Sequence, residues 1–342
     1  MYMGKNSYMM YGGLKMQDID KELSRMYDFN IDKIYPLKNY YIIETSEGKK
    51  VLKNINCSPE RIMFVHGAKE HLYNNGFKNI DRYVCNKAKS PVLSINGELY
   101  TVSDAVEGRE CDFNSREDVI RASKMLAMLH KASKGYIPPQ NSIARDDLGK
   151  LPEYFNKRLE EIKRTKKMAQ RERGKFDYLI LEYIDYFYEL GENALERIHN
   201  SMYFDVVKKS REDRLFCHHD YTHCNIICKD TETSVINFEY CSFELKVYDV
   251  ANLLRRKMRK CNWDIDEAMV IIDAYTSIEP ISKDEFEILK IMLQFPQKFW
   301  RVVNRHYNSR RIRREKSFAA RFNEVIEEIE YHKKFLNEFN KI

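Results

Sequence analysis

The chain has 342 residues, which exceeds a typical single domain and provides material for two lobes with a buried core. Hydrophobic residues make up 43% of it and charged residues 32%, with only 12 Gly and 8 Pro, which excludes a disordered chain and favours a helix-rich globular one. The 58 basic and 52 acidic residues leave a formal charge of +6, too small a surplus to indicate an anionic partner.

Residues 1–30 form a leading segment that is expected to begin as a loosely ordered tail rich in Tyr, Met and Gly. It lacks the basic region and apolar run of a secretion signal, and no stretch of ~18 uninterrupted apolar residues follows, so no membrane span is predicted. The eight cysteines are spread along the chain rather than closely spaced as in a disulfide-stapled domain. This spacing predicts reduced thiols and synthesis in the cytoplasm.

Residues 31–106 consist of short β-type runs around one helix. The helix is expected to begin after Ser58, a good N-cap, and to end near Gly76. Asn96 and Gly97 separate two further β-type runs and predict a tight hairpin turn. Together these signals predict an N-lobe with a five-stranded antiparallel sheet and one helix.

Residues 107–342 are expected to form a larger, helical C-lobe. After Gly108 the apolar pattern changes from a period of two to a helical one of about 3.6 residues. Residues 151–198 read as two antiparallel helices with a break at Gly174, and residues 264–342 are helical again. The predicted fold class is therefore α+β with two lobes.

One segment of the C-lobe, residues 216–230 (FCHHDYTHCNIICKD), interrupts the helical pattern and reads as a loop between two short strands. Phosphoryl transfer from a nucleotide requires a carboxylate to accept the proton of the substrate hydroxyl and oxygen ligands for Mg²⁺. Asp220 meets the first requirement, and Asn225 meets part of the second. An isolated Asp and Asn at this spacing would usually be a polar turn, so the neighbouring sequence decides the interpretation.

That neighbouring sequence resembles the aminoglycoside and choline kinases over roughly residues 30 to 300. Residues 218–225 (HHDYTHCN) and residues 236–240 (INFEY) are similar to the HGDxxxxN and IDxE motifs of this family. Residues 248–256 (YDVANLLRR) are similar to its YDLA element. The three elements occur in the family's order and spacing, which makes the resemblance specific.

The resemblance implies a two-lobed protein-kinase-like fold and an ATP- and Mg²⁺-dependent phosphotransferase acting on a hydroxyl group of a small molecule. In this interpretation Asp220 is the catalytic base and Asn225 is a metal ligand. Asp249 would brace the catalytic loop. The sequence does not identify the acceptor, because the variable helices that would bind it carry no transferable motif.

The chain also resembles a subgroup of this superfamily, the CotS-type spore coat proteins. Phrases such as YTVSDAVEGRECDF, LAMLHKASKGY and FCHHDYTHCNII carry this similarity. The resemblance implies a protein that is made in the cytoplasm of the sporulating cell and is then deposited in the spore coat. Other spore coat proteins would be its partners.

The N-lobe supplies candidates for nucleotide binding. By resemblance, Lys53 would contact the α and β phosphates, although a solvated strand lysine is the simpler interpretation of the KKVLK run. The family position of its glutamate partner falls near Val65 to His66, whereas Glu60 and Glu70 each lie a turn or more away. The backbone of Asp104 and Val106, where the lobes join, would bind the adenine ring.

The main departure from the family pattern is Asn237, which stands where the family has the Asp that binds Mg²⁺. Mg²⁺ favours anionic oxygen, whereas an amide offers a neutral one. If the following residues form an extended strand, Glu239 lies on the same face as Asn237 and could reach the metal. The predicted metal ligands are therefore Asn225, Asn237 and Glu239.

Two functional hypotheses remain open from the sequence. The first is a weakly active phosphotransferase of the spore coat. The second is a catalytically dead pseudokinase that acts as a structural or interaction component of the coat, which Asn237 and the 23 tyrosines favour.

Two other kinds of site are disfavoured. The His and Cys residues of the loop match no structural zinc spacing. The basic runs in the helices read as solvated faces, so nucleic acid is not an expected partner.

Overall fold

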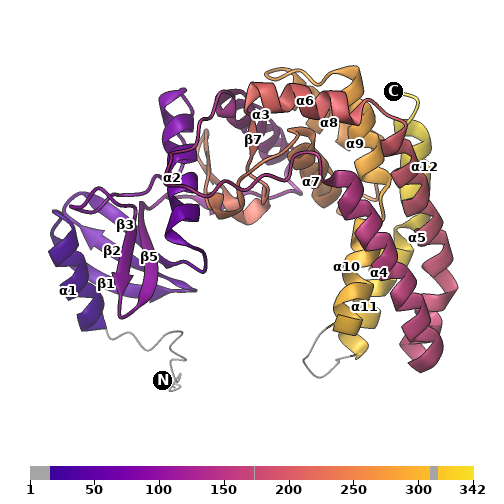
Figure 1. Cartoon of the computed structure of the whole chain (residues 1–342), viewed down its shortest axis with the longest axis horizontal. Helices are drawn as coiled ribbons and strands as arrows, with labels where there is room; N and C mark the ends of the chain where they lie inside the picture. Colours follow the sequence, from indigo (N-terminus) through magenta and orange to yellow (C-terminus); the bar gives the residue numbers. More distant parts are fainter. Residues whose placement is uncertain (1–15, 173, 309–314) are drawn as a thin grey trace.

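The computed structural model describes residues 16–172, 174–308 and 315–342. Its N-terminal part is a five-stranded antiparallel sheet in the order β1-β2-β3-β5-β4 (Figure 1). The strands are β1 (Ile31–Leu37), β2 (Tyr40–Thr45), β3 (Gly48–Asn54), β4 (Val92–Ile95) and β5 (Glu98–Asp104). The predicted antiparallel sheet is confirmed, and Asn96 and Gly97, both with positive φ, form the β4–β5 turn.

Helix α1 (Met16–Met26) covers one face of this sheet, which the sequence interpretation did not foresee. Its apolar residues Ile19 and Leu23 are fully buried against strand residues such as Leu52 and Val102. Since successive strand residues point to opposite faces, burial of Leu52 on this side turns Lys53 toward the other. The sheet therefore presents Lys53 to the side on which the C-terminal part lies.

Helix α2 (Pro59–Asn74) connects β3 to β4 and begins and ends where the sequence predicted. The Ser58 Oγ accepts a hydrogen bond from the Arg61 backbone N–H, as expected of an N-cap. Gly76, with φ +88°, follows the last turn. The buried face of α2 carries one charged residue, Lys69, among its apolar side chains.

The C-terminal part is largely helical, as predicted, with two small sheets, β10-β7 and β6-β8-β9, around the loop of residues 216–230. Its helices are α3 (Arg116–Ser133), α4 (Leu151–Glu172), α5 (Lys175–His199), α6 (Tyr203–Asp213), α7 (Val247–Met258), α8 (Ile265–Thr276), α9 (Lys283–Gln294), α10 (Gln297–Asn308), α11 (Glu315–Glu327) and α12 (Ile329–Phe339). Its strands and 3₁₀ turns are β6 (Arg109–Glu110), β7 (Phe216–Cys217), η1 (His223–Asn225), β8 (Ile226–Lys229), β9 (Glu232–Val235), η2 (Phe238–Tyr240) and β10 (Ser242–Phe243).

Helices α4, α5, α10 and α11 form a long bundle at the opposite end of the molecule from the five-stranded sheet (Figure 1). The bundle has its own apolar core, in which the rings of Phe187 and Phe299 stack with centroids 4.2 Å apart. Gly174 is the N-cap of α5, which confirms the predicted break between α4 and α5. None of the helices in the described ranges is both long and apolar enough to cross a membrane.

The extended strand expected through Asn237 and Glu239 is wrong. Strand β9 ends at Val235, Asn237 adopts a left-handed conformation (φ 66°, ψ 64°), and η2 follows. Asn tolerates this conformation better than most residues. The buried residues Val235 and Phe238 are three apart, so the alternation of a strand stops at Val235.

Candidate functional site

Asp249 of α7 anchors the loop of residues 216–230. Its carboxylate is fully buried and accepts hydrogen bonds from the backbone N–H groups of His218 (2.7 Å) and His219 (3.0 Å). The ring of His130, from α3, lies 3.3 Å from the same carboxylate. Burial opposes ionisation, but the hydrogen bond from His130 and the charges of nearby histidines hold the pKa of Asp249 below its usual value. The bracing role implied by resemblance thus has a geometric basis.

The anchored loop presents the carboxylate of Asp220, which is 40% exposed. The Asn225 Nδ2 donates to Asp220 Oδ2 (3.0 Å) and to the Asp220 carbonyl (2.9 Å). Arg256 of α7 lies 3.9 Å from Asp220 Oδ1. His219 takes a left-handed φ of 69° and its ring stacks on Tyr248. The structure therefore holds Asp220 rigidly while leaving it accessible.

A continuous chain of side-chain hydrogen bonds links this loop to the five-stranded sheet. Asn237 Nδ2 donates to Asn225 Oδ1 (2.8 Å), and Lys53 Nζ donates to Asn237 Oδ1 (2.9 Å). Lys53 Nζ also pairs with Glu239 Oε1 at 2.7 Å. Asp220, Asn225, Asn237, Glu239 and Lys53 thus lie together, although Lys53 is 184 residues away from Asn237 in the sequence.

The ion-pair partner of Lys53 is Glu239 rather than a glutamate of α2. Glu70 of α2 pairs with Arg82 (2.6 Å), and Glu60 is exposed in the first turn. Burial would raise the pKa of Glu239, but the charges of Lys53 and Lys69 hold it below its usual value. The Glu239 carboxylate is therefore ionised and paired with Lys53.

Lys69 and Asp81 support the site from behind, and the sequence interpretation missed both. Lys69 is fully buried, lies 3.0 Å from Asp81 Oδ1 and donates to the Asp81 carbonyl. Asp81 Oδ2 accepts the backbone N–H of Asn237 at 3.1 Å. A lysine between Ala68 and Leu72 on the apolar face of a helix was the available signal, because an ionised side chain there requires a partner.

Arg61 also fixes this segment. Its guanidinium donates to the carbonyl of Glu239 at 2.9 Å and to the carbonyl of Cys241. Helix α2 thereby holds the backbone that carries Glu239, so the site depends on α2 even without a helix glutamate at Lys53.

The two residues predicted to bind adenine lie where β5 leads into the C-terminal part. The Asp104 N–H donates to the Arg82 carbonyl at 3.2 Å, and its carboxylate pairs with Lys50 at 2.6 Å. The Ala105 N–H donates to the Lys49 carbonyl. In the described part of the chain, no backbone group takes up the amide of Val106. An adenine contact by Asp104 and Val106 stays a prediction.

The residues expected to hold Mg²⁺ do not fit that ion in this arrangement. Asn225 Oδ1 and Asn237 Oδ1 each already accept a hydrogen bond, and Glu239 is paired with Lys53. Mg²⁺ in nucleotide sites is usually bound by one or two carboxylates together with phosphate oxygens. Here the cluster offers two amide oxygens and one carboxylate, that of Glu239, and the Lys53 ammonium already balances the charge of this carboxylate.

The chain is similar to known proteins over most of its length. The family described as "Spore coat putative kinase YutH" matches residues 20–339. Spore coat protein S of Bacillus subtilis (strain 168) is 26% identical over 305 residues, which cover 87% of each chain.

Solved structures share the fold. An aminoglycoside phosphotransferase from Alicyclobacillus acidocaldarius has a TM-score of 0.84 at 22% identity, with 97% of each chain covered. A spectinomycin phosphotransferase, solved with ADP and spectinomycin, has a TM-score of 0.62 at 12% identity, with 94% of this chain and 98% of that one covered. The predicted kinase-like fold is thereby confirmed, and the chain belongs to the spore coat putative kinase YutH family.

Proposed function

We propose that this protein is a spore coat component whose kinase-like site is catalytically degenerate, so that the fold serves interaction with other coat proteins. Membership of the spore coat family and similarity to spore coat protein S support its place in the coat, after synthesis in the cytoplasm. The chain of hydrogen bonds from Lys53 through Asn237 to Asn225 carries the proposal of degeneracy.

The physical reason is the charge of the groups at this position. Where the related kinases have a metal-binding Asp, this chain has an amide whose nitrogen donates to the second candidate ligand, Asn225. An aspartate there could not donate that bond. If weakened charge stabilisation cost even ~4 kcal/mol, transfer would slow about 10³-fold.

A second candidate is slow phosphoryl transfer from ATP to a hydroxyl group of a small molecule. The retained geometry of Asp220 favours it, because the carboxylate is exposed and bonded to Asn225 as a base would be. Lys53 would contact the phosphates, and Asp104 and Val106 the adenine. Two structural neighbours were solved with ADP or with AMP-PNP and Ca²⁺, which is the source of the nucleotide expectation.

Melting temperature in the presence of Mg-ATP tests these candidates. A ligand that binds only the folded state adds RT ln(1 + [L]/Kd) to its stability, so active-type binding would raise the melting temperature with concentration. We expect no Mg²⁺-dependent rise. A clear rise, with ATP consumption that Asp220→Ala abolishes, would replace the first candidate by the second.

Coat assembly provides the complementary test. In sporulating cells, Asp220→Ala should leave incorporation into the coat unchanged, because the proposed role does not use the base. If Asp220→Ala folds with an unchanged melting temperature but is absent from the coat, the proposal of an interaction role without turnover is wrong.

A further inference from the structure

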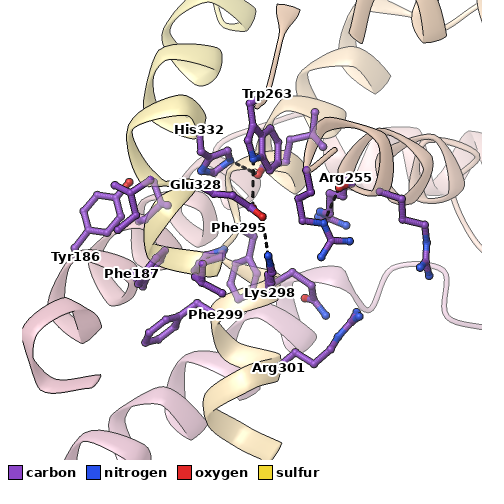
Figure 2. Close-up of a pocket in the computed structure, with 18 of the residues that line it drawn as sticks. Tyr186, Phe187, Arg255, Trp263, Phe295, Lys298, Phe299, Arg301, Glu328 and His332 are labelled. Atoms are coloured by element: carbon purple, nitrogen blue, oxygen red, sulfur yellow. Dashed lines mark hydrogen bonds and ion pairs between the residues drawn. The ribbon is translucent and has the colours of Figure 1, made fainter. Parts of the chain in front are cut away.

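A cavity of about 70 Å³ lies among α5, α7, α10 and α12, away from the sheet (Figure 2). It adjoins a second pocket of about 310 Å³, with which it shares Arg259, Lys298 and Arg301. The first space has room for a small group only, whereas the second is within the range of sites that hold small molecules. Its walls include aromatic rings from several elements, and Figure 2 shows Tyr186, Phe187, Trp263, Phe295 and Phe299 around the space. These rings offer apolar contacts to a ligand that reaches in from the second pocket.

The charge of the cavity wall is strongly positive. The wall contains one carboxylate, Glu328, and five cationic side chains: Arg255, Arg256, Arg259, Lys298 and Arg301. Lys298 Nζ pairs with Glu328 at 2.6 Å, and Trp263 Nε1 also donates to this carboxylate at 3.4 Å. Glu328 is therefore paired with Lys298, and no other carboxylate among the described residues of the cavity wall balances the charge of the four arginines.

These arginines lack carboxylate partners in the wall. The guanidinium of Arg255 donates to Asn252 Oδ1 and to the Met292 carbonyl, and its Nε is buried without a hydrogen-bond partner. Arg259 Nε donates to the Arg255 carbonyl. Arg301 remains partly exposed to solvent, and in the described parts of the chain it has no hydrogen-bond or ion-pair partner. Like charges this close disfavour one another, and an anion bound among them would relieve that repulsion.

The titration behaviour agrees with this geometry. Burial lowers the pKa of Arg255 to about 9, and burial together with neighbouring arginines lowers the pKa of Arg301. His332, also in the wall, has a pKa lowered to about 4 by burial and is neutral at pH 7. Like charges that destabilise one another are typical of ligand sites.

The cavity adjoins the candidate site, since Arg256 belongs to its wall and lies 3.9 Å from Asp220 Oδ1. Of the two neighbouring pockets that Arg259 and Lys298 also border, the larger has three glutamates in its wall, whereas the second pocket has five cationic side chains and one carboxylate, Glu324. We propose that this cavity and the second pocket together bind a small molecule with an apolar body and an anionic group, a phosphate or a carboxylate, held by Arg259 and Arg301. The proposal goes beyond the proposed function, because binding requires neither ATP nor transfer.

Isothermal titration calorimetry of the full chain without nucleotide tests this with three probes that share one ring: 1-naphthyl phosphate, 1-naphthoate and 1-naphthylmethylammonium. We expect both anions to bind and the cation not to bind. Tighter binding of the phosphate assigns a phosphoryl ligand, and tighter binding of 1-naphthoate a carboxylate; either supports the proposal. Equal binding of the cation, or no binding of either anion at millimolar concentration, overturns it.

Variants then locate the anion. Arg301→Ala and Arg259→Gln should each weaken binding of the anions roughly tenfold, the effect expected for one charged hydrogen bond. Arg164→Ala, an exposed arginine of α4 outside the cavity, is the matched control and should leave binding unchanged. If Arg259→Gln folds poorly, two measurements still test the site. Arg301→Ala should weaken anion binding, and wild-type binding should weaken as NaCl is raised from about 0.05 M to about 0.5 M. Anion binding that resists both variants and salt overturns the proposal.

Because binding is measured without ATP, its outcome is separate from that of the proposed function. Binding of an anion without transfer supports the cavity and the degenerate site together. Phosphoryl transfer to any acceptor would contradict the proposed function, whereas the cavity proposal is decided by the binding of the anions and by the two arginine variants.

Discussion

Lys53 Nζ lies 2.9 Å from Asn237 Oδ1, so that a lysine of strand β3 contacts a left-handed asparagine 184 residues later in the chain. The same ammonium group pairs with Glu239 at 2.7 Å. The Lys53 ammonium group therefore lies between the oxygens of Asn237 and Glu239.

Asn237→Asp should create Mg²⁺-dependent binding of ATP. The new carboxylate cannot donate to Asn225 Oδ1, so it frees that oxygen and adds an anionic ligand. At an ATP concentration of about 100 times Kd, the linked gain is about 2.7 kcal/mol, or roughly 4 °C in melting temperature. Differential scanning fluorimetry with and without Mg²⁺ measures it.

Asn262→Asp is the matched control, because Asn262 is also left-handed (φ 49°) and exposed but lies outside this hydrogen-bond chain. A response to Mg²⁺ in both variants, or in neither, would contradict the role assigned to Asn237.

Asp249→Asn should destabilise the protein by about 3 kcal/mol, since it weakens charge-assisted bonds to two backbone N–H groups and one to His130. Urea unfolding gives the free energy. Asp213→Asn, at an exposed aspartate, should change it by less than about 0.5 kcal/mol. Equal losses in the two variants would show that Asp249 does not brace the loop.

Lys69→Met should cost about 3 kcal/mol, because it leaves the carboxylate of Asp81 buried without its cation. Adding Asp81→Asn to this variant should recover part of the loss, since an amide needs no counter-charge. The double-mutant cycle in urea measures this coupling. Strictly additive losses would contradict a buried ion pair.

Stability should fall between pH 7 and pH 4. Burial lowers the pKa of both His219 and His332 to about 4, so the unfolded chain, with ordinary histidines, binds protons first as the pH falls. Each neutral histidine therefore stabilises the folded state above the pKa of the unfolded chain. This stabilisation is lost progressively as the pH falls from the unfolded pKa to the folded one. Each should contribute a loss of about 2 kcal/mol between pH 8 and pH 5.

Urea midpoints across this range measure the effect. His332→Gln should reduce the slope by a third to a half, because glutamine can still bond to the Leu293 carbonyl but does not titrate, whereas His219 and His66, whose pKa values burial also lowers, still do. His199→Gln, at an exposed histidine of α5, should leave the slope unchanged. An unaltered slope in His332→Gln would contradict the assignment.

The local elements were largely predictable because their signals are local. Ser58 and Gly76 bound α2, Gly174 begins α5, and Asn96 with Gly97 forms a turn, each through backbone preferences that act within a few residues. Helix α1 was missed, since it is defined by the sheet that it covers.

The sequence by itself determined the kinase-like fold, and it pointed to five residues that the structure brings together, because motif spacing along the chain and turn chemistry are encoded locally. These residues are Lys53, Asp220, Asn225, Asn237 and Glu239. Only the tertiary structure decided what Lys53 contacts. Its partner is Glu239, 186 residues later. The hydrogen bond between Asn237 and Asn225 depends on the left-handed conformation of Asn237, where the sequence had predicted an extended strand. Contacts of this kind arise from packing α2, the sheet and α7 around one loop, and no periodicity in the sequence records them.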